Sequence, residues 1–220
     1  MVVGEHPIKL NQCDGVDLPI HLFLQLYVVL LIALLLFHAA FTYSLFLKII
    51  GGLNPLTFYR KMKDVALFAF STSSSAATIP VTLRTVNQDL GVNQNVASFV
   101  VPVGATINMD GTAIMQGLAT MFIASTVGVD LSLVQYGQIV LLAMVTSIGT
   151  AAVPSAGTVT LALILGSVGL PLDAIGLILA VDRILDMIRT SVNVCGDAAV
   201  SCIVAKSESE LEEKTFNKLG

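Results

Sequence analysis

The chain has 220 residues, of which 55% are hydrophobic and only 12% are charged, and its formal net charge is −4. Soluble domains carry about twice that share of charged residues, so the composition predicts a chain whose solvent is lipid. The 11 Lys and Arg leave no basic stripe for nucleic acid, and the three cysteines have no metal-site spacing and no even number. Composition therefore excludes a disordered chain, a disulfide scaffold and a nucleic-acid partner.

The first apolar segment predicts one transmembrane helix over residues 18–50, after a polar, loop-like segment at 1–17. Leu18–Leu47 is 30 residues long and contains no Asp, Glu, Lys or Arg. About 20 apolar residues cross a bilayer as a helix, so this span is over-long or tilted. It is too long for a signal peptide, and no Ala-x-Ala cleavage site follows it.

Two later uncharged stretches are interrupted by polar centres, at Ser71–Pro80 and Ser147–Thr158. The apolar arms on either side of the second centre are roughly 10–16 residues long, too short to cross a bilayer alone. We therefore predict two re-entrant helical hairpins, over about residues 55–90 and 131–172.

A helix with a polar centre follows each hairpin, over residues 95–129 and 174–205. Between Pro80 and Asp110 the offset is 30 residues, and between Pro154 and Asp186 it is 32. Interrupted apolar segments at matching positions of two halves are typical of inverted transporter repeats with a site at the midplane. The alternative, that small residues merely allow close helix packing, does not explain two matched tips and two matched charged helices.

The basic residues indicate the orientation. If the two hairpins enter from opposite sides, seven Lys and Arg lie on one side of the membrane, which the positive-inside rule assigns to the cytoplasm. They are Arg60, Lys61, Lys63, Arg84, Lys206, Lys214 and Lys218. The tail at 206–220 is then predicted to be cytoplasmic, solvated and frayed.

One face of the last helix carries an unusual set of polar residues. They fall within an arc of about 80°. They are Asp182, Asp186, Arg189, Asn193 and Asp197. An ion pair between Asp186 and Arg189 would neutralise two charges. Asp197 and Asp110 have no basic partner nearby in sequence, and buried carboxylates of that kind hold protons or bind cations.

The neighbours of Asp110 and Asp197 carry oxygen atoms, which are the ligands that a hard cation prefers. Freed backbone groups at the interrupted helices could bind Na⁺ and the carboxylate of a zwitterionic solute, while Arg189 could fork onto a second carboxylate and Asp186 accept from an ammonium. An intramembrane hydrolase ranks low, because no GxSxG motif occurs and His6, His21 and His38 are remote from the Ser-rich tips. A channel ranks below a transporter, because a channel does not need an Asp–Arg pair beside two tips.

Four motifs carry a resemblance to a known family. They read STSSSAATIP at 71–80, GATINMDGTA at 104–113, SIGTAAVPSAG at 147–157 and DRILDMIRTSVNVCGD at 182–197. In this order they resemble the dicarboxylate/amino acid:cation symporters, which include the sodium-coupled glutamate/aspartate transporters. The resemblance covers roughly residues 50–205. It implies an all-α integral membrane fold with one transmembrane helix before two inverted repeats, each a re-entrant hairpin and a broken helix, so that residues 51–205 form a transport domain.

The resemblance also implies the substrate site. Arg189 would pair with the side-chain carboxylate of an acidic amino acid, and Asp186 would hold its amino group. The residues implied to hold the α-carboxylate or line the pocket are Ser74, Ser75, Thr112, Val153, Pro154, Ala156, Gly157, Thr190 and Asn193.

Three sodium sites are implied in the same way, Na⁺ being the coupled ion and no cofactor being expected. The first uses Asp197 with backbone oxygens of Gly104, Asn108 and Asn193. The second uses backbone oxygens of Thr106, Ser147, Ile148 and Thr150 beside Met109. The third uses Asp110 and Asn108 with oxygens from a helix outside this chain.

The acids and Arg189 favour an L-aspartate or L-glutamate carrier over the family's neutral amino acid and C4-dicarboxylate carriers, which remain the alternatives. Family members often carry an arginine at one of two places that here hold Ser73 and Met187, which puts potassium counter-transport in doubt. The resemblance implies a plasma-membrane homotrimer with elevator motion and no enzyme activity. Because the family is about twice as long, we expect this half-chain to be inactive alone.

Overall fold

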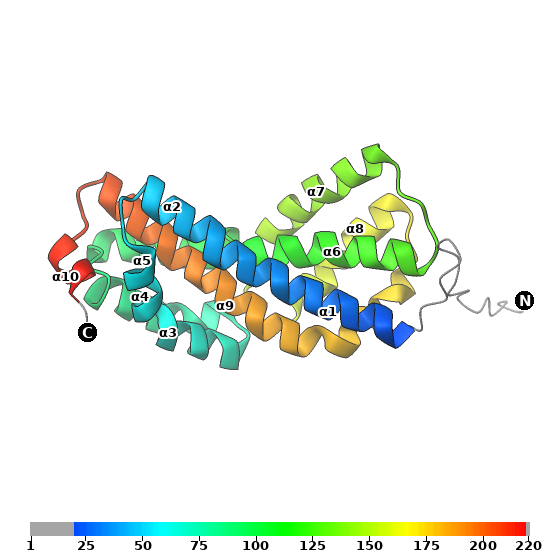
Figure 1. Ribbon diagram of the computed structural model, residues 1–220, viewed down its shortest axis with the longest axis horizontal. Coiled ribbons are helices and arrows are strands. Elements are labelled where there is room, and N and C mark those ends of the chain that lie inside the picture. The colour runs from blue at the N-terminus through cyan, green and yellow to red at the C-terminus, as the bar shows by residue number, and fades with distance from the viewer. Residues whose placement is uncertain (1–19, 219–220) are drawn as a thin grey trace, which may run out of the picture.

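The computed structural model describes residues 20–218, which fold into helices joined by short loops (Figure 1). In chain order the elements are α1 (Ile20–Phe37), η1 (His38–Tyr43), α2 (Ser44–Ile49), α3 (Pro55–Thr72), α4 (Ser75–Gln88), α5 (Gln94–Ile107), α6 (Asp110–Thr126), α7 (Leu133–Ile148), α8 (Ala156–Val168), η2 (Leu172–Ala174), α9 (Ile175–Ser207) and α10 (Glu213–Asn217). The all-helical class predicted from sequence is confirmed for these residues. The polar segment at 1–17 lies outside them.

The first three elements form one long rod that corresponds to the predicted span. Residues His21–Ile49 are long and apolar enough to cross a membrane, and only 17% of the most apolar window is buried inside the fold. A core helix of a soluble protein would be mostly buried, so this exposure favours contact with lipid. The middle of the rod, η1, is π-helical, a rare conformation that often marks functional positions.

The polar centres of the two interrupted stretches become the tips of two helical hairpins. In the first, α3 ends at Ser73, whose backbone is left-handed (φ 52°), and the Ser74 hydroxyl caps α4 by accepting from the Ala77 amide. In the second, α7 ends at Gly149, and Ser155 (φ 58°) precedes α8. Figure 1 shows the hairpins entering from opposite ends of the molecule and meeting at their tips.

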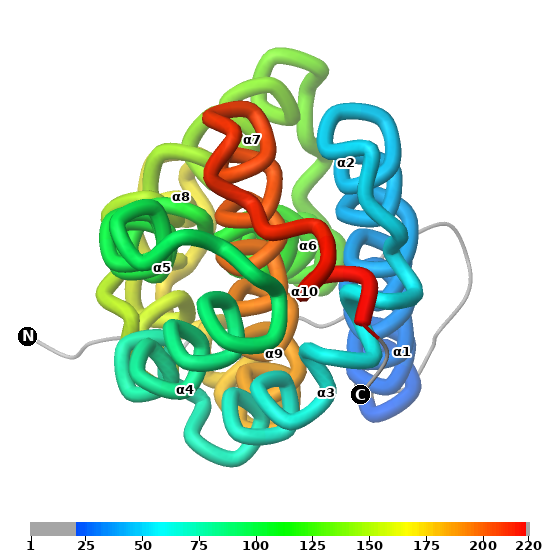
Figure 2. Tube along the Cα trace, turned by 90° about the vertical axis from the view of Figure 1, so that its left-hand side faces the viewer, coloured from blue at the N-terminus to red at the C-terminus, as the bar shows by residue number. Residues whose placement is uncertain are grey.

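The helix between the hairpins is broken at Asn108 and Met109, whose ψ angles of 73° and 52° interrupt the helical path between α5 and α6. The last helix, α9, is central and runs without a break from Ile175 to Ser207, so the prediction of a broken helix in the second repeat was wrong. It packs against α1, against the α3–α4 hairpin, against both halves of the broken helix and against α8. Figure 2 shows it running between α1 on one side and α3–α5 on the other.

The C-terminal tail is ordered and packed as far as Lys218, so the prediction of a frayed end was wrong. Phe216 of α10 is fully buried. Lys61 of α3 donates to the carbonyl oxygens of Thr215 (2.7 Å) and Phe216 (2.8 Å). One apolar side chain within a hydrophilic segment gives too little pattern to reveal this docking.

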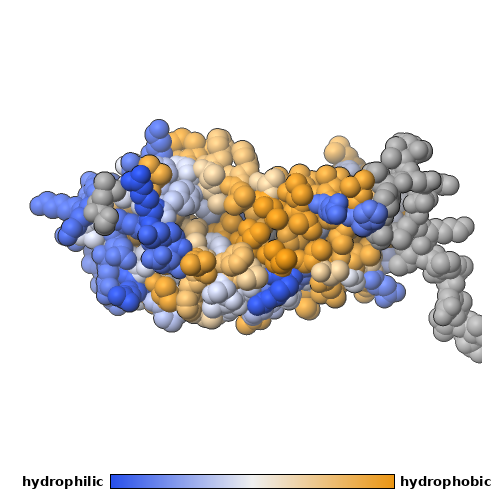
Figure 3. Space-filling view, turned by 60° about the horizontal axis from the view of Figure 1, so that its bottom comes forward, coloured by the Kyte–Doolittle hydropathy of each residue, from blue (hydrophilic) through white to orange (hydrophobic). Residues whose placement is uncertain are grey.

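The surface is divided between apolar and hydrophilic regions. Figure 3 shows apolar residues over much of the middle of the molecule and hydrophilic residues gathered at the end that carries α10. Exposed large apolar side chains occur on α1, α2, α7 and α8, and a contiguous surface of this kind indicates contact with another apolar phase.

Candidate substrate and cation site

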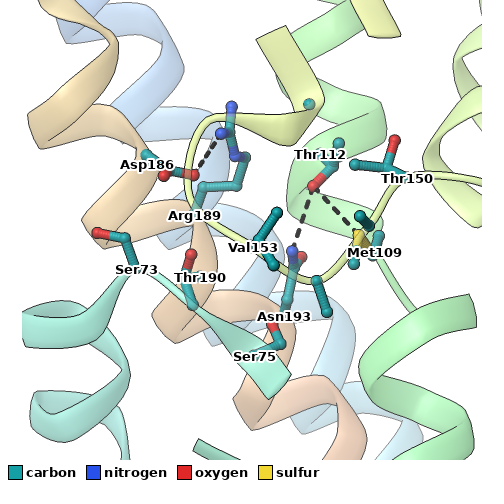
Figure 4. Close-up of a pocket in the computed structure, with 13 residues that line it drawn as sticks. Ser73, Ser75, Met109, Thr112, Thr150, Val153, Asp186, Arg189, Thr190 and Asn193 are labelled. Carbon is teal, nitrogen blue, oxygen red and sulfur yellow. Dashed lines mark hydrogen bonds and ion pairs between the residues drawn. The ribbon is translucent and has the colours of Figure 1, made fainter. Parts of the chain in front are cut away.

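The tips of the two hairpins meet at the middle of α9 and enclose a small polar cavity (Figure 4). The tips touch directly, because the Ser74 hydroxyl donates to the Ala152 carbonyl at 2.8 Å and the Ala76 amide donates to the same oxygen at 3.3 Å. The lining residues are Ser73, Ser75, Met109, Thr112, Thr150, Ala151, Ala152, Val153, Gly157, Asp186, Arg189, Thr190 and Asn193. The cavity measures about 20 Å³, which is room for roughly one water molecule.

Among the described residues, Arg189 is the only cationic group lining this cavity, and its side chain is almost completely buried (2% exposed). Its Nη2 donates to Asp186 Oδ1 one helical turn away, which confirms the pairing inferred from sequence. Its Nη1 lies 3.7 Å from Asp182 Oδ1 and has no hydrogen-bond partner among the described residues. The guanidinium is therefore held in place while keeping donors free for a further acceptor.

Asp186 also binds the tip of the second hairpin. Its Oδ2 accepts from the Ser155 amide at 2.9 Å. Ser155 has a left-handed backbone (φ 58°) and lies at the turn before α8. Asp186 thus joins the α7–α8 tip to the cationic group of α9, so a movement of that tip would alter the environment of Arg189.

Asn193 connects the cavity to the broken helix. Its Oδ1 accepts from the Gly111 amide at 2.8 Å, and its Nδ2 donates to the Thr112 hydroxyl at 3.3 Å. The Gly111 amide lies in the first turn of α6, where it has no intrahelical acceptor of its own. Asn193 therefore supplies a hydrogen bond that the break in the helix requires.

Gln116 of α6 fastens both arms of the α7–α8 hairpin. Its Nε2 donates to the Gly157 carbonyl (3.1 Å) and to the Thr160 hydroxyl (2.8 Å) on α8, and its Oε1 accepts from Thr146 on α7 (2.8 Å). Gln116 is fully buried. This network fixes the hairpin below its tip.

Three of the residues predicted for the first cation site, Asp197, Asn108 and Gly104, lie close together in the fold. Asp197 is 2% exposed, and its Oδ1 accepts from Asn108 Nδ2 at 2.9 Å. Gly104 lies so close that a methyl group in place of its hydrogen would come within 2.7 Å of the same oxygen. The carboxylate therefore lies against the backbone at the end of α5, where helix carbonyls are available as ligands for a hard cation.

The environment of Asp110 corrects one inference from sequence, that this carboxylate lacks a basic partner. His38 Nε2 lies 3.0 Å from Asp110 Oδ2, and the Tyr43 hydroxyl donates to the same oxygen at 3.3 Å. His38 and Tyr43 are the two ends of η1. His38 lies 72 residues before Asp110 in the sequence, so no local pattern reveals this contact.

The residues assigned to the second cation site lie at the end of α5 and at the end of α7, two elements that contact each other. Ser147 and Thr150 are buried, whereas Thr106 and Ile148 are exposed. Among the described residues, no three His, Cys, Asp or Glu side chains gather as a metal-ion cluster. Any cation here would rely on backbone and amide oxygens, which suits Na⁺ better than a transition metal.

The sequence profile of the sodium:dicarboxylate symporter family matches residues 18–207. The chain belongs to this family. It is 45% identical over 181 residues to an excitatory amino acid transporter of Caenorhabditis elegans, covering 82% of this chain and 36% of that protein.

Two mammalian relatives give a similar result. The chain is 44% identical over 190 residues to excitatory amino acid transporter 2 of Homo sapiens, which covers 86% of this chain and 33% of the relative. It is 44% identical over 191 residues to excitatory amino acid transporter 3 of Mus musculus, covering 86% and 36%. The symporter family member described here thus spans about a third of the length of these relatives.

Most of the residues predicted for the substrate line the cavity of this symporter family member. They are Ser75, Thr112, Val153, Gly157, Asp186, Arg189, Thr190 and Asn193. The predicted residues Ser74, Pro154 and Ala156 belong to the two tips but do not line it.

Sequence reasoning gave no role in the site to several residues that the fold brings there. Ser73 lines the cavity and its buried hydroxyl has no partner among the described residues. Its place in the Ser-rich tip was the available signal. No sequence pattern distinguishes Thr158, Gln116 or Tyr43 as part of the site, since single polar residues in apolar helices are common.

Proposed function

We propose that this chain provides the substrate-binding part of a sodium-coupled symporter for an acidic amino acid, L-aspartate or L-glutamate. The observation that carries the proposal is the buried pair of Asp186 and Arg189 in one cavity between the two hairpin tips. The relatives are named as excitatory amino acid transporters, which supports an amino acid as the substrate.

The chemistry of the cavity matches such a substrate. Arg189 presents a planar fork that fits a carboxylate, and Asp186 accepts from an ammonium. The second carboxylate would be held by Asn193 and by amides of the tips around Ser75 and Val153. A neutral amino acid would leave Arg189 Nη1 without an acceptor, and a dicarboxylate would bring no ammonium for Asp186.

The proposed coupling to Na⁺ rests on the buried carboxylates near the cavity. Asp197 lies against the end of α5 and accepts from Asn108, and Asn193, one turn earlier on α9, accepts from Gly111 just after the break in the helix. Binding an anionic substrate beside these carboxylates is unfavourable unless cations bind as well. The three proposed sodium sites would supply them.

The size of the cavity supports a gate. About 20 Å³ cannot hold an amino acid, so the substrate must enter through a movement of a tip. The α7–α8 tip is held to Asp186 by the Ser155 amide and to the first hairpin through Ala152, and we assign the gate to it.

The same proposal covers the whole assembly. Residues 51–205 would move together as the transport domain of an elevator in a plasma-membrane homotrimer. The two hairpins would be re-entrant, with α10 on the cytoplasmic side. The clustering of Lys61 with α10 at one end of the molecule agrees with the predicted common side of the basic residues.

Uptake of labelled L-aspartate tests the proposal. The chain is joined to the N-terminal part of an excitatory amino acid transporter relative and reconstituted in vesicles, with choline replacing sodium in the control. We expect the uptake to depend on sodium and to be blocked neither by excess succinate nor by excess serine. Block by succinate would indicate a dicarboxylate carrier, block by serine a neutral amino acid carrier, and uptake independent of sodium would refute the cation sites.

A further inference from the structure

A hydrogen bond between a hydroxyl and a carboxylate lies beside Arg189 but outside the lining of the cavity. Thr158, in the first turn of α8, donates its hydroxyl to Asp182 Oδ1 at 2.7 Å. Arg189 Nη1 lies 3.7 Å from the same oxygen. All three side chains are at least 97% buried. One carboxylate oxygen is therefore shared by a hairpin residue and the guanidinium.

The two distances show which neighbour holds the oxygen. At 2.7 Å the Thr158 hydroxyl makes a full hydrogen bond, whereas 3.7 Å is beyond hydrogen-bond range for Arg189. Arg189 Nη1 and Asp182 Oδ2 are both buried without a partner among the described residues. A carboxylate oxygen can accept two hydrogen bonds, so it is the position of Asp182 Oδ1, set by its bond to Thr158 and by the local packing, that leaves Arg189 Nη1 beyond hydrogen-bond distance.

We propose that Thr158 is a positioning residue that holds Asp182 away from Arg189 and so leaves the guanidinium available to the acidic side chain of the substrate. This inference rests on the proposed function. Without the hydroxyl, Asp182 Oδ1 would lose its donor and would draw Nη1 into a direct ion pair. Asp182 would then compete with the substrate carboxylate for Arg189.

The position of Thr158 gives this contact a link to the gate. Thr158 lies three residues after Ser155, the residue of the α7–α8 tip whose amide donates to Asp186. The second hairpin therefore touches both acids that flank Arg189.

Substitutions at Thr158 and Asp182 test the proposal in the joined chain described above. Thr158→Val keeps the shape and removes the hydroxyl, and Thr158→Ser restores the hydroxyl. We expect the Val variant to raise the KM for L-aspartate about tenfold, the factor that corresponds to 1.4 kcal/mol. The Ser variant should stay within about twofold of the parent, and the half-saturating sodium concentration should be unchanged in both.

The decisive comparison is made in an Asp182→Asn background, where the competing charge is gone. There the effect of Thr158→Val on the KM should fall below about threefold, because nothing draws the guanidinium away. An equal effect in both backgrounds, or a KM for the Val variant within about twofold of the parent, would overturn the proposal. Thr158→Ala replaces the Val variant if the latter fails to reach the vesicles.

The test separates this inference from the proposed function. If the parent chain shows no sodium-dependent aspartate uptake, the proposed function fails. If the parent transports aspartate and the Thr158 variants behave like it, the proposed function stands and only the positioning role is refuted. A general loss of packing would shift the sodium dependence and would not be repaired by Asp182→Asn.

Discussion

Replacing Arg189 with Cys is expected to abolish high-affinity binding of acidic amino acids. Arg189 is 2% exposed, and its guanidinium is the only cation lining the cavity. Truncating one partner of a buried, hydrogen-bonded charge pair costs about 2–5 kcal/mol of binding free energy. At 1.4 kcal/mol per factor of ten, the affinity for L-aspartate should fall by roughly 30- to 4,000-fold.

Uptake of labelled L-aspartate and, separately, of labelled L-serine measures this change in the joined chain. Aspartate uptake should fall in the Cys variant, and serine uptake should rise above that of the parent, because a neutral side chain no longer faces a buried cation. Arg189→Lys is the matched control, since it keeps the charge but loses the planar fork, and its affinity should fall between the two. Retained aspartate affinity in the Cys variant would refute the role assigned to Arg189.

Three further predictions concern the cation site and the tail. Asp197→Asn should raise the half-saturating sodium concentration at least about tenfold, and an unchanged sodium titration would count against the site. Gly104→Ala should also weaken sodium dependence, because its methyl group would lie 2.7 Å from Asp197 Oδ1, whereas Gly117→Ala, with open space at that point, should leave it unchanged. Phe216→Ala should release α10 from α3 at a cost of about 3–5 kcal/mol and speed tryptic cleavage of the tail, and a cleavage rate equal to that of the parent would show that α10 does not depend on this side chain.

The helical elements could be predicted because strong local signals mark their ends. Ser and Thr at the first tip cannot remain in lipid as part of a straight helix, and the turn at Ser73 and the cap at Ser74 lie within that polar run. The helix after it breaks at Asn108, inside the predicted polar centre. Periodicity of 3.6 residues likewise placed the acids of α9 on one face, and the structure buries that face.

The contacts between elements could not be predicted in the same way. The bond between Ser74 and Ala152 depends on how two hairpins from different halves of the chain approach each other. His38 lies beside Asp110 because the π-helical turn of η1 faces the break between α5 and α6. No local pattern encodes either distance, although the matched positions of the two interrupted stretches already suggested that the tips and α9 share one site.

The buried charges of α9 give a physical reason for the proposed joint binding of substrate and cation. Counted in their ionised forms, Asp182, Asp186 and Asp197 oppose the single guanidinium of Arg189, and each of these side chains is at most 3% exposed. An acidic amino acid brings a further net negative charge into this low-dielectric region, where like charges repel strongly. Sodium ions near Asp197 would offset that repulsion without touching the substrate. Coupling of this kind follows from the sum of the buried charges. Substrate affinity should therefore rise with sodium concentration, although the sodium ions make no direct contact with the substrate.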